Sequence, residues 1–161
     1  MPILSLNIPE RRKSVLIGKN GSVKKMIEEK TKSKITIGNG VEIEGENPLI
    51  AKDIVQAIAR GFDSETALLL LDEDNCLEMI SLEGERENTR KRLFARVIGK
   101  DGKIKKFIEN STDTHITIYG KTVSIIGEWK MVSIARKTVE IVLSGKPFSA
   151  MKAFLERELK G

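Results

Sequence analysis

The amino-acid sequence predicts an α+β protein of two similar units, each with a three-stranded antiparallel sheet packed by three helices and an extra helix after them. The main observation is an internal repeat, because residues 16–27 recur as residues 97–108 with an offset of 81. Both copies contain an aliphatic pair, then Gly-Lys-x-Gly, then a helical pattern with two adjacent lysines. The second observation is that strand-like and helix-like segments follow in the same order around each copy. We therefore place a linker in the acidic residues 72–75 and expect domains at 1–74 and 75–161.

The first unit is expected to begin with a strand that Pro9 ends. Two helices flank the glycine turn, and the second of them has Val23, Met26 and Ile27 on one side. Alternating segments on both sides of the turn sequence Gly-Asn-Gly form a hairpin. Pro48 favours the start of the third helix and Gly61 its end. In chain order we expect strand 3–8, helix 10–17, helix 22–31, strand 34–37, strand 41–44, helix 48–60 and an extra helix at 64–71 with Ser64 as its N-cap.

The second unit repeats this order. Its hairpin loop is one residue longer, so the last strand corresponds to its counterpart at an offset of 82. Gly145 ends the third helix as Gly61 does in the first unit. In chain order we expect strand 76–82, helix 88–98, helix 103–110, strand 115–118, strand 123–125, helix 129–143 and an extra amphipathic helix at 147–160.

The glycine turns have the composition of an anion-binding loop. Two glycines three residues apart allow a sharp turn and leave no side chain to keep a ligand's backbone away. Asn20 and Asp101 precede the second glycine and are favoured N-caps, which predicts helices that begin at Ser22 and Lys103 with free amides facing the loop. The positive end of a helix attracts phosphate. Mobile charge is added nearby by Lys19, Lys24, Lys25, Lys100, Lys103, Lys105 and Lys106.

Composition limits the other functions. The net charge of +5 and pI near 9.3 favour a polyanionic partner. Cys76 is the single cysteine, which excludes an intrachain disulfide and a thiolate metal site, and we expect it to be buried. His115 is the sole histidine and is expected to face solvent. Because no paired carboxylates or metal-ligand spacings are visible, we predict no enzyme, no catalytic residue, no metal and no cofactor. No signal peptide or membrane-spanning run is visible, so we expect a cytoplasmic protein.

The order strand, helix, Gly-x-x-Gly, helix, two strands and helix resembles the type I KH domain, twice over nearly the whole chain. The tandem arrangement also resembles the small-subunit ribosome assembly factors called partner of Nob, in their archaeal form. The similar residues are 96–103, 112–118 and the closing Ser-Gly-Lys-Pro at 144–147. Eukaryotic members have lost the first glycine turn, whereas residues 18–21 are intact here. The resemblance implies binding near the 3′ end of the small-subunit rRNA precursor, with the Nob endonuclease and other ribosome assembly or initiation factors as partners.

KH modules clamp about four nucleotides of single-stranded RNA at the glycine turn, with the bases over an apolar groove. The aliphatic residues assigned to these grooves are Ile17, Val23, Ile27, Ile35 and Ile37 in the first unit and Ile98, Ile104, Ile108, Ile116 and Ile118 in the second; most are expected to be core and about a third to touch bases. The predicted RNA-binding residues are Gly18, Lys19, Asn20, Gly21, Lys24, Lys25, Arg96, Ile98, Gly99, Lys100, Asp101, Gly102, Lys103, Lys105, Lys106, Ile116 and Ile118.

Two other functions remain open at this point. In the first, the extra helices at 64–71 and 148–159 dock protein partners and RNA contact is secondary. The apolar residues 68–71, Phe148, Met151 and Phe154 suggest this function, although packing of the two units against each other would also explain them. In the second, the chain is a KH subunit of an RNA-degrading or transcription complex. That function fits less well, because such a chain is expected to carry an additional barrel domain.

Overall fold

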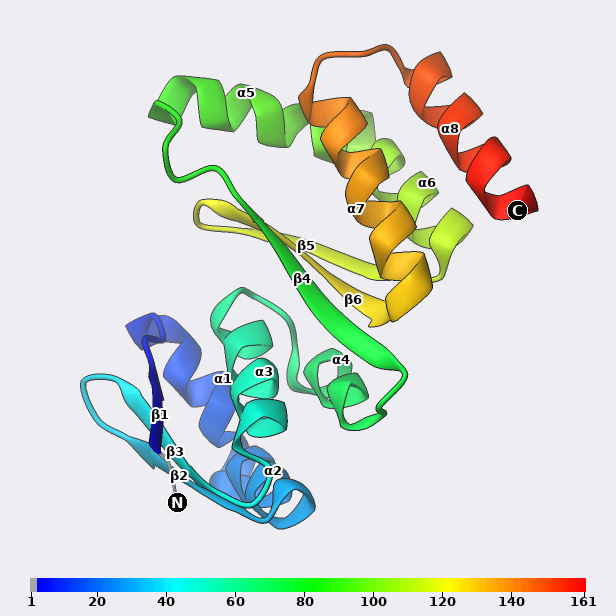
Figure 1. The fold of residues 1–161 in the computed structure, drawn as a ribbon. Helices are drawn as coiled ribbons and strands as arrows, with labels where there is room; N and C mark the ends of the chain where they lie inside the picture. The colour runs from blue at the N-terminus through cyan, green and yellow to red at the C-terminus, as the bar shows by residue number, and fades with distance from the viewer. Residues whose placement is uncertain (1–2) are drawn as a thin grey trace. The chain divides into compact units, whose positions relative to one another are not determined.

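The computed structural model describes residues 3–161 and divides them into two units, one ending at Leu77 and the other running from Glu78 to Gly161 (Figure 1). Each unit has a three-stranded antiparallel sheet with helices on one face. The strand orders are β1-β3-β2 and β4-β6-β5, so the last strand of each hairpin lies in the middle of its sheet. The predicted α+β fold of two similar units, each with a three-stranded antiparallel sheet packed by helices, is confirmed.

In the first unit, the helices and strands follow one another in the predicted order. Leu4 and Ile35 both pair with Ile43 across the sheet, and the helices cover the face on which these residues lie. Leu16, Ile54 and Ile58 complete a core that solvent does not reach. The elements are β1 (Ile3–Leu6), α1 (Lys13–Ile17), α2 (Ser22–Thr31), β2 (Ser33–Ile37), β3 (Val41–Gly45), α3 (Pro48–Ala59) and α4 (Ser64–Ala67), with 3-10 turns at Glu10–Arg12, Lys19–Gly21 and Leu68–Leu71.

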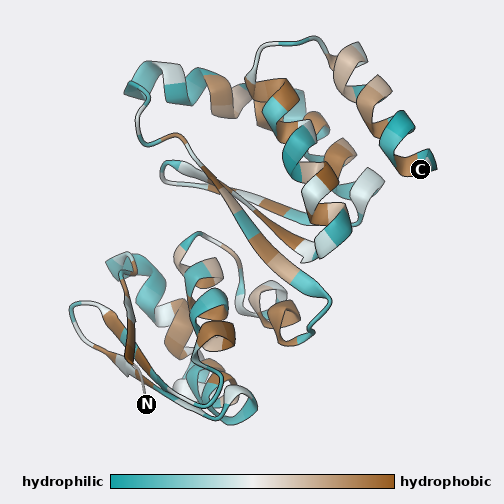
Figure 2. Ribbon diagram, in the orientation of Figure 1, coloured by the Kyte–Doolittle hydropathy of each residue, from teal (hydrophilic) through white to brown (hydrophobic). Residues whose placement is uncertain are grey.

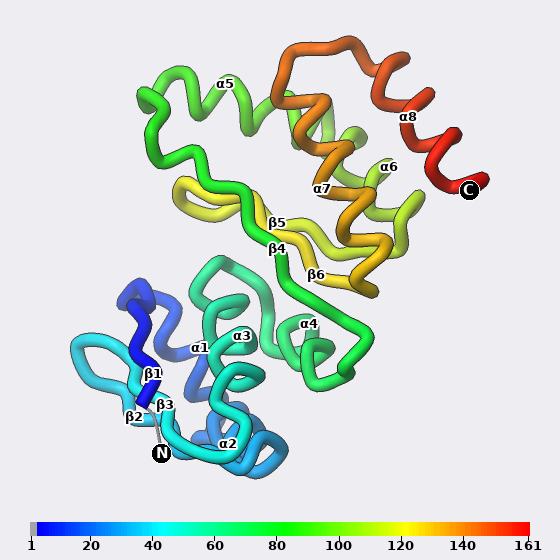
Figure 3. Tube along the Cα trace, viewed as in Figure 1, coloured from blue at the N-terminus to red at the C-terminus, as the bar shows by residue number. Residues whose placement is uncertain are grey.

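The second unit has the same order, and its helices α5, α7 and α8 are longer than their counterparts in the first unit. Ile116 pairs with Ile125, and both are buried together with Val97, Ile108 and Val139 of the helices. The chain then turns after α7, and α8 runs back beside that helix (Figure 3) with Met151 and Leu155 buried. The elements are β4 (Asn75–Ser81), α5 (Glu87–Ile98), a 3-10 turn at Lys100–Gly102, α6 (Lys103–Thr112), β5 (His115–Tyr119), β6 (Thr122–Glu128), α7 (Trp129–Leu143) and α8 (Phe148–Lys160).

The hydrophobic faces of the helices explain this packing. In Figure 2 the longer helices carry both brown and teal residues, as expected of helices with one apolar and one polar side. In α6, for example, Ile108 is buried while Lys106 is exposed. Over residues 3–161, none of the helices combines the length and the apolar character that crossing a membrane would need.

Several local predictions differ from the structure. The first strand ends at Leu6, and residues 10–17 form a 3-10 turn followed by a five-residue helix, because Arg12 N donates to Pro9 O at 2.8 Å. The N-cap of α4 is Asp63 and not Ser64. Asp63 has the extended backbone that an N-cap needs, and its Oδ1 accepts a hydrogen bond from Thr66 N at 2.7 Å. Cys76 is half-buried, less than expected, whereas His115 is exposed as predicted.

Candidate nucleic-acid interface

The two glycine turns have nearly identical backbones. Gly18 and Gly99 have φ of 74° and 73°, and Gly21 and Gly102 both have φ of 75°. The helices begin at Ser22 and Lys103, as predicted. The predicted role of Asn20 and Asp101 as N-caps is wrong. Both residues have φ of 56°, in the left-handed region that Asn and Asp tolerate best among residues with a side chain. The N-cap position belongs instead to the second glycine, Gly21 or Gly102.

The first glycine of each turn is required for internal packing. A Cβ atom on Gly99 would lie 2.8 Å from both Ile104 Cβ and Ile104 N, and it would also collide with Ile104 Cγ1. Val23 occupies the same place against Gly18. The backbone of the turn therefore lies directly against the first turn of the following helix. At this position glycine serves the close contact inside the protein and not the approach of a ligand.

The second glycine of each turn faces open space. A Cβ atom on Gly102 would meet only the flexible end of Lys106, at 3.8 Å, and Gly21 has the same relation to Lys25 at 3.9 Å. A ligand's backbone can therefore approach here. The expectation of free amides in the loop needs correction, however. Gly102 N donates to Gly99 O at 3.2 Å, and Lys103 N donates to Lys100 O, so these amides are already bonded.

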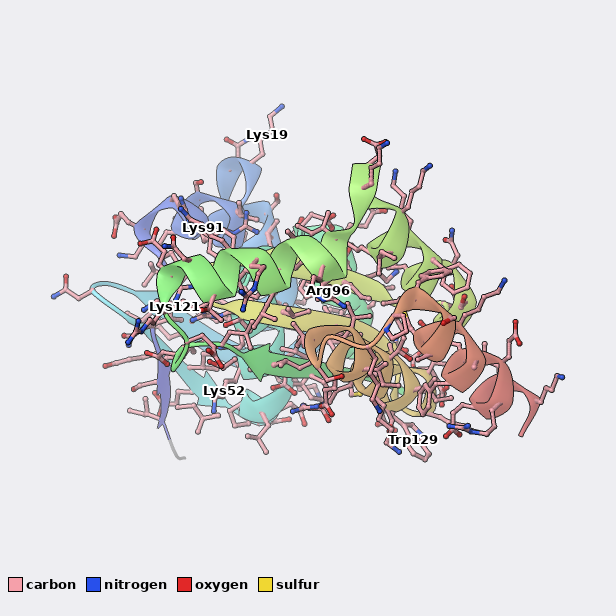
Figure 4. All side chains as sticks on the ribbon, turned by 90° about the horizontal axis from the view of Figure 1, so that it is seen from above. Lys19, Lys52, Lys91, Arg96, Lys121 and Trp129 are labelled. Carbon is pink, nitrogen blue, oxygen red and sulfur yellow. The ribbon has the colours of Figure 1, made fainter. Side chains whose placement is uncertain are left out.

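The lysines around the turns fall into two groups. One group is exposed at the turn or on the outer side of the following helix: Lys19, Lys25, Lys100, Lys103 and Lys106. In Figure 4, Lys19 extends away from its unit. The other group is half-buried and paired with a glutamate one helical turn later. Lys24 Nζ lies 3.4 Å from Glu28 Oε2, and Lys105 Nζ lies 3.2 Å from Glu109 Oε1.

The glutamates of these pairs have a second contact that explains their position. Glu109 Oε2 accepts a hydrogen bond from Ile116 N at 2.9 Å, and Glu28 Oε2 accepts one from Ile35 N at 2.8 Å. Each carboxylate thus links the helix after the turn to the neighbouring strand by a hydrogen bond. The paired lysine balances the carboxylate charge. Lys24 and Lys105 therefore stabilise the structure around the turn, and they are less available for binding a ligand than the exposed lysines.

Arg96 is also bound within the protein. Its Nε donates to Val142 O at 3.2 Å and its Nη2 donates to Lys146 O at 3.1 Å, which joins α5 to the end of α7 (Figure 4). In the first unit Arg12 makes the equivalent bonds to Ile58 O and Phe62 O, at 2.8 and 2.6 Å. Sequence reasoning missed Arg12, because the carbonyl groups that it binds are 46 and 50 residues away in the chain.

The groove aliphatics divide by exposure. Ile116 is 3% exposed, so its prediction as an RNA contact is corrected: it is a core residue on which the sheet packs. Ile108, Ile27 and Ile35 are buried in the same way. The groove residues that remain accessible are Ile17, Val23 and Ile37 in the first unit and Ile98, Ile104 and Ile118 in the second.

The turns and their exposed lysines thus form a basic, open surface at the positive end of a ten-residue helix in each unit. In residues 3–161, no group of three or more His, Cys, Asp or Glu side chains is arranged to hold a metal ion. The chemistry available at the surface is the binding of phosphate by cations, beside apolar side chains that can contact bases.

Comparison with known proteins agrees with this surface. Residues 76–160 match the family described as eukaryotic type KH-domain (KH-domain type I), and residues 3–58 match the KH domain. A KH domain-containing protein of Methanocaldococcus jannaschii is 43% identical over 164 residues, covering 95% of this chain and 72% of that protein.

Two further relatives are described by what they process or bind. The pre-rRNA-processing protein PNO1 of Gibberella zeae is 32% identical over 130 residues, covering 78% of this chain, and the match spans about half (49%) of the fungal protein. The Dim2p chain in the crystal structure of an a/eIF2alpha-aDim2p-rRNA complex from Pyrococcus horikoshii is 40% identical, with a TM-score of 0.88 and coverage of 99% of this chain and 94% of that one. The chain therefore belongs to the type I KH family of RNA-binding proteins, as a tandem KH protein homologous to the pre-rRNA-processing factors PNO1 and Dim2p.

Proposed function

We propose that this chain is an assembly factor of the small ribosomal subunit that binds single-stranded RNA near the 3′ end of the small-subunit rRNA precursor. The observation that carries the proposal is the open side of Gly102, which has exposed lysines on both sides of it. Lys100 and Lys103 belong to the turn and the start of α6, and Lys106 lies one turn further. Phosphates of an RNA strand would be held by these side chains and by the positive end of the helix.

The bases of that strand would lie over the accessible aliphatics Ile98, Ile104 and Ile118. Because aromatic residues make up only 4% of the chain, shape and hydrogen bonds to base edges would supply most of the selectivity in this groove. The first unit offers the same arrangement around Gly21, with Lys19 and Lys25. The RNA-binding residues that we propose after the structure are Lys19, Asn20, Gly21, Lys25, Ile98, Lys100, Asp101, Gly102, Lys103, Lys106 and Ile118, with Gly18, Gly99, Arg96, Lys24 and Lys105 in supporting roles.

The relatives support rRNA and an initiation factor as partners. The Pyrococcus Dim2p chain was crystallised with rRNA and a/eIF2alpha, and PNO1 is named for pre-rRNA processing. We therefore include rRNA and an initiation factor among the partners of this chain, and we add the Nob endonuclease, which the family resemblance implies. We also propose residues 1–74 and 75–161 as the two domains, since β4 begins at Asn75 and pairs with β6 of the second unit.

A charge exchange at the second turn tests the RNA site. Lys100→Asp together with Lys103→Asp should weaken binding of a single-stranded RNA from the 3′ end of the organism's own small-subunit rRNA. The expected loss is about 2 kcal/mol or more, roughly thirtyfold in the dissociation constant, measured by fluorescence anisotropy. Lys130→Asp together with Lys137→Asp on the exposed side of α7 makes the same change in net charge and is the matched control. Equal losses in both double variants would reject the turn as the site.

A docking function for the extra helices has one observation in its favour. Phe148 and Leu159 of α8 are 45% and 41% exposed. The opposite side of the helix is occupied, because Met151 and Leu155 are buried. Removing α8 would therefore also open the core, and the substitution Leu159→Ser is the cleaner test. Loss of partner capture with unchanged RNA affinity would favour docking.

A further inference from the structure

A pocket of about 270 Å³ lies in the second unit beside the glycine turn. Four elements surround it: the end of α5, the start of α6, the end of α7 and the start of α8. Its inner wall is apolar, because Met151 and Val142 are buried there. Its outer wall is the ring of Phe148, which is 45% exposed and rests edge-on against Phe107 with 5.3 Å between the ring centroids. The pocket is lined by Arg96, Ile104, Val142, Lys146, Pro147, Phe148 and Met151.

The pocket shares one residue with the proposed RNA groove. Ile104 forms part of its lining and is also the residue that packs against Gly99, so one side chain is shared by the turn and the pocket. A strand that leaves the turn on this side would meet the pocket directly. The occupant would therefore be the next part of the same strand.

The charge of the lining suits a nucleotide. Arg96 and Lys146 are the only ionisable side chains among the lining residues, and both are cationic. The bonds from Arg96 to the two carbonyls use two of the five N–H groups of its guanidinium, and they hold the group in a fixed orientation. A phosphate or a base edge can be bound by the rest. The exposed ring of Phe148 offers a face on which a base of any type can stack.

The first unit differs at the corresponding positions. When Gly61 is aligned with Gly145, Phe62 stands in place of Lys146 and Asp63 in place of Pro147. Ser64 replaces Phe148 and Ala67 replaces Met151. The aromatic wall and the basic residue are therefore properties of the second unit.

We infer that this pocket binds a nucleobase of the single-stranded RNA, next to the nucleotides clamped at the second glycine turn. The base stacks on Phe148 over Ile104 and Met151, and Arg96 and Lys146 contact its phosphate. The inference rests on the proposed RNA binding at residues 99–102. It makes the site of the second unit longer than the four nucleotides of a single clamp, and it leaves the first unit with the shorter site.

The test compares RNAs of different lengths. One RNA has about four nucleotides and fills only the clamp, and two others carry two further nucleotides at the 5′ or at the 3′ end. Phe148→Ala should weaken binding of one of the extended RNAs about tenfold and change binding of the short RNA less than twofold. Phe148→Leu, which keeps an apolar side chain without the ring, should show most of the same loss. Leu159→Ala, at the other end of α8, is the matched control and should change neither affinity.

Salt dependence separates the two parts of the pocket. Phe148→Ala should leave the slope of log affinity against log salt unchanged, because stacking releases no counterions, whereas Lys146→Ala should reduce that slope by about 0.7 for the extended RNA. Chemical denaturation establishes that each variant is folded, and NMR titration supplies the weak affinities of the short RNA.

Different results would reject the nucleobase pocket and the RNA site at the glycine turn. Phe148 variants that weaken the short and extended RNAs equally, or weaken neither, overturn the nucleobase pocket even if the glycine turn binds RNA. The same holds for variants that lose only the capture of a protein partner, which would make the pocket a peptide site. If Lys100→Asp with Lys103→Asp leaves the short RNA bound as before, the proposed function itself fails.

Discussion

Arg12 and Arg96 hold the same two carbonyl positions in their units, although they stand one helical turn apart when the glycine turns are aligned. Arg12 lies six residues before Gly18, and Arg96 lies three residues before Gly99. Each donates to a carbonyl in the last turn of the helix after the hairpin and to one four residues further along the chain. Ile58 O and Val142 O also accept the N–H groups of Gly61 and Gly145, both at 3.1 Å, so each arginine uses the second lone pair of the carbonyl. A cation is favoured at this negative end of a helix. The two units therefore share the position of the guanidinium group in the fold, although the arginine occupies different sequence positions relative to the glycine turn.

Replacing Arg96 should reduce stability more than it reduces RNA binding. In Arg96→Lys the charge remains, but an ammonium group cannot bond both carbonyls with the geometry of the guanidinium fork. We expect a loss of about 1–2 kcal/mol in the free energy of unfolding, measured by urea denaturation. RNA affinity should change less than twofold for a four-nucleotide RNA. A Lys variant with the stability of the original chain would show that the two bonds contribute nothing.

The neighbouring lysines Lys105 and Lys106 should behave differently, although both follow the glycine turn. Lys106 is exposed beside the open side of Gly102, whereas Lys105 is paired with Glu109. Lys106→Met should weaken RNA binding by about 1 kcal/mol, roughly fivefold. Lys105→Met should have less than half that effect in free energy. Each substitution removes one positive charge, so each serves as the control for the other in anisotropy titrations. The reverse order of losses would contradict the assignment.

The two glycines of the second turn should differ in the same manner. Gly99→Ala places a Cβ atom against Ile104 and should cost more than about 3 kcal/mol of folding free energy, because both a clash and a left-handed backbone must be accommodated. Gly102→Ala meets only the end of Lys106, so its cost should be about 1–2 kcal/mol, from the backbone conformation alone. Thermal denaturation measures both.

A second substitution tests the cause assigned to Gly99. Shortening Ile104 to Ala removes the side-chain part of the contact, but Ile104 N would still lie 2.8 Å from the added Cβ atom. The double variant should therefore recover little of the lost stability. Full recovery would mean that the side chain, and not the backbone, makes glycine necessary at this position.

The fold was predictable from sequence because each local pattern occurs twice and agrees with its copy. The Gly-Lys-x-Gly turns, the hairpin at Gly38–Gly40 and the stops at Gly61 and Gly145 fixed the order of elements. The errors lie where two local explanations compete. Asn20 and Asp101 suit either an N-cap or a left-handed turn, and the residue type does not decide between these conformations.

The roles of individual site residues were less predictable, because they depend on contacts far along the chain. Glu109 is visible as a partner of Lys105 one turn away, but its bond to Ile116 N requires the strand to be in place. The bonds of Arg96 link residues 46 and 50 positions apart. Alternation of apolar residues predicts β5 but does not say which isoleucine is covered. Ile116 therefore fits the groove by sequence, although the structure places it in the core.

Salt dependence should reveal how many phosphates the second turn holds. If about four phosphates of a single strand are neutralised, the slope of log affinity against log salt should be near −3, since each phosphate contributes about −0.7. Lys100→Ala with Lys103→Ala removes two of the cations, and the slope should then be about −1.4. Anisotropy titrations of the same RNA from low to moderate salt measure both slopes. The matched pair Lys130→Ala with Lys137→Ala leaves the turn unchanged and should keep the original slope. If both pairs of substitutions reduce the slope equally, RNA is attracted by the overall charge of the protein. At a localised site the slope falls only when the lysines that contact the phosphates are removed.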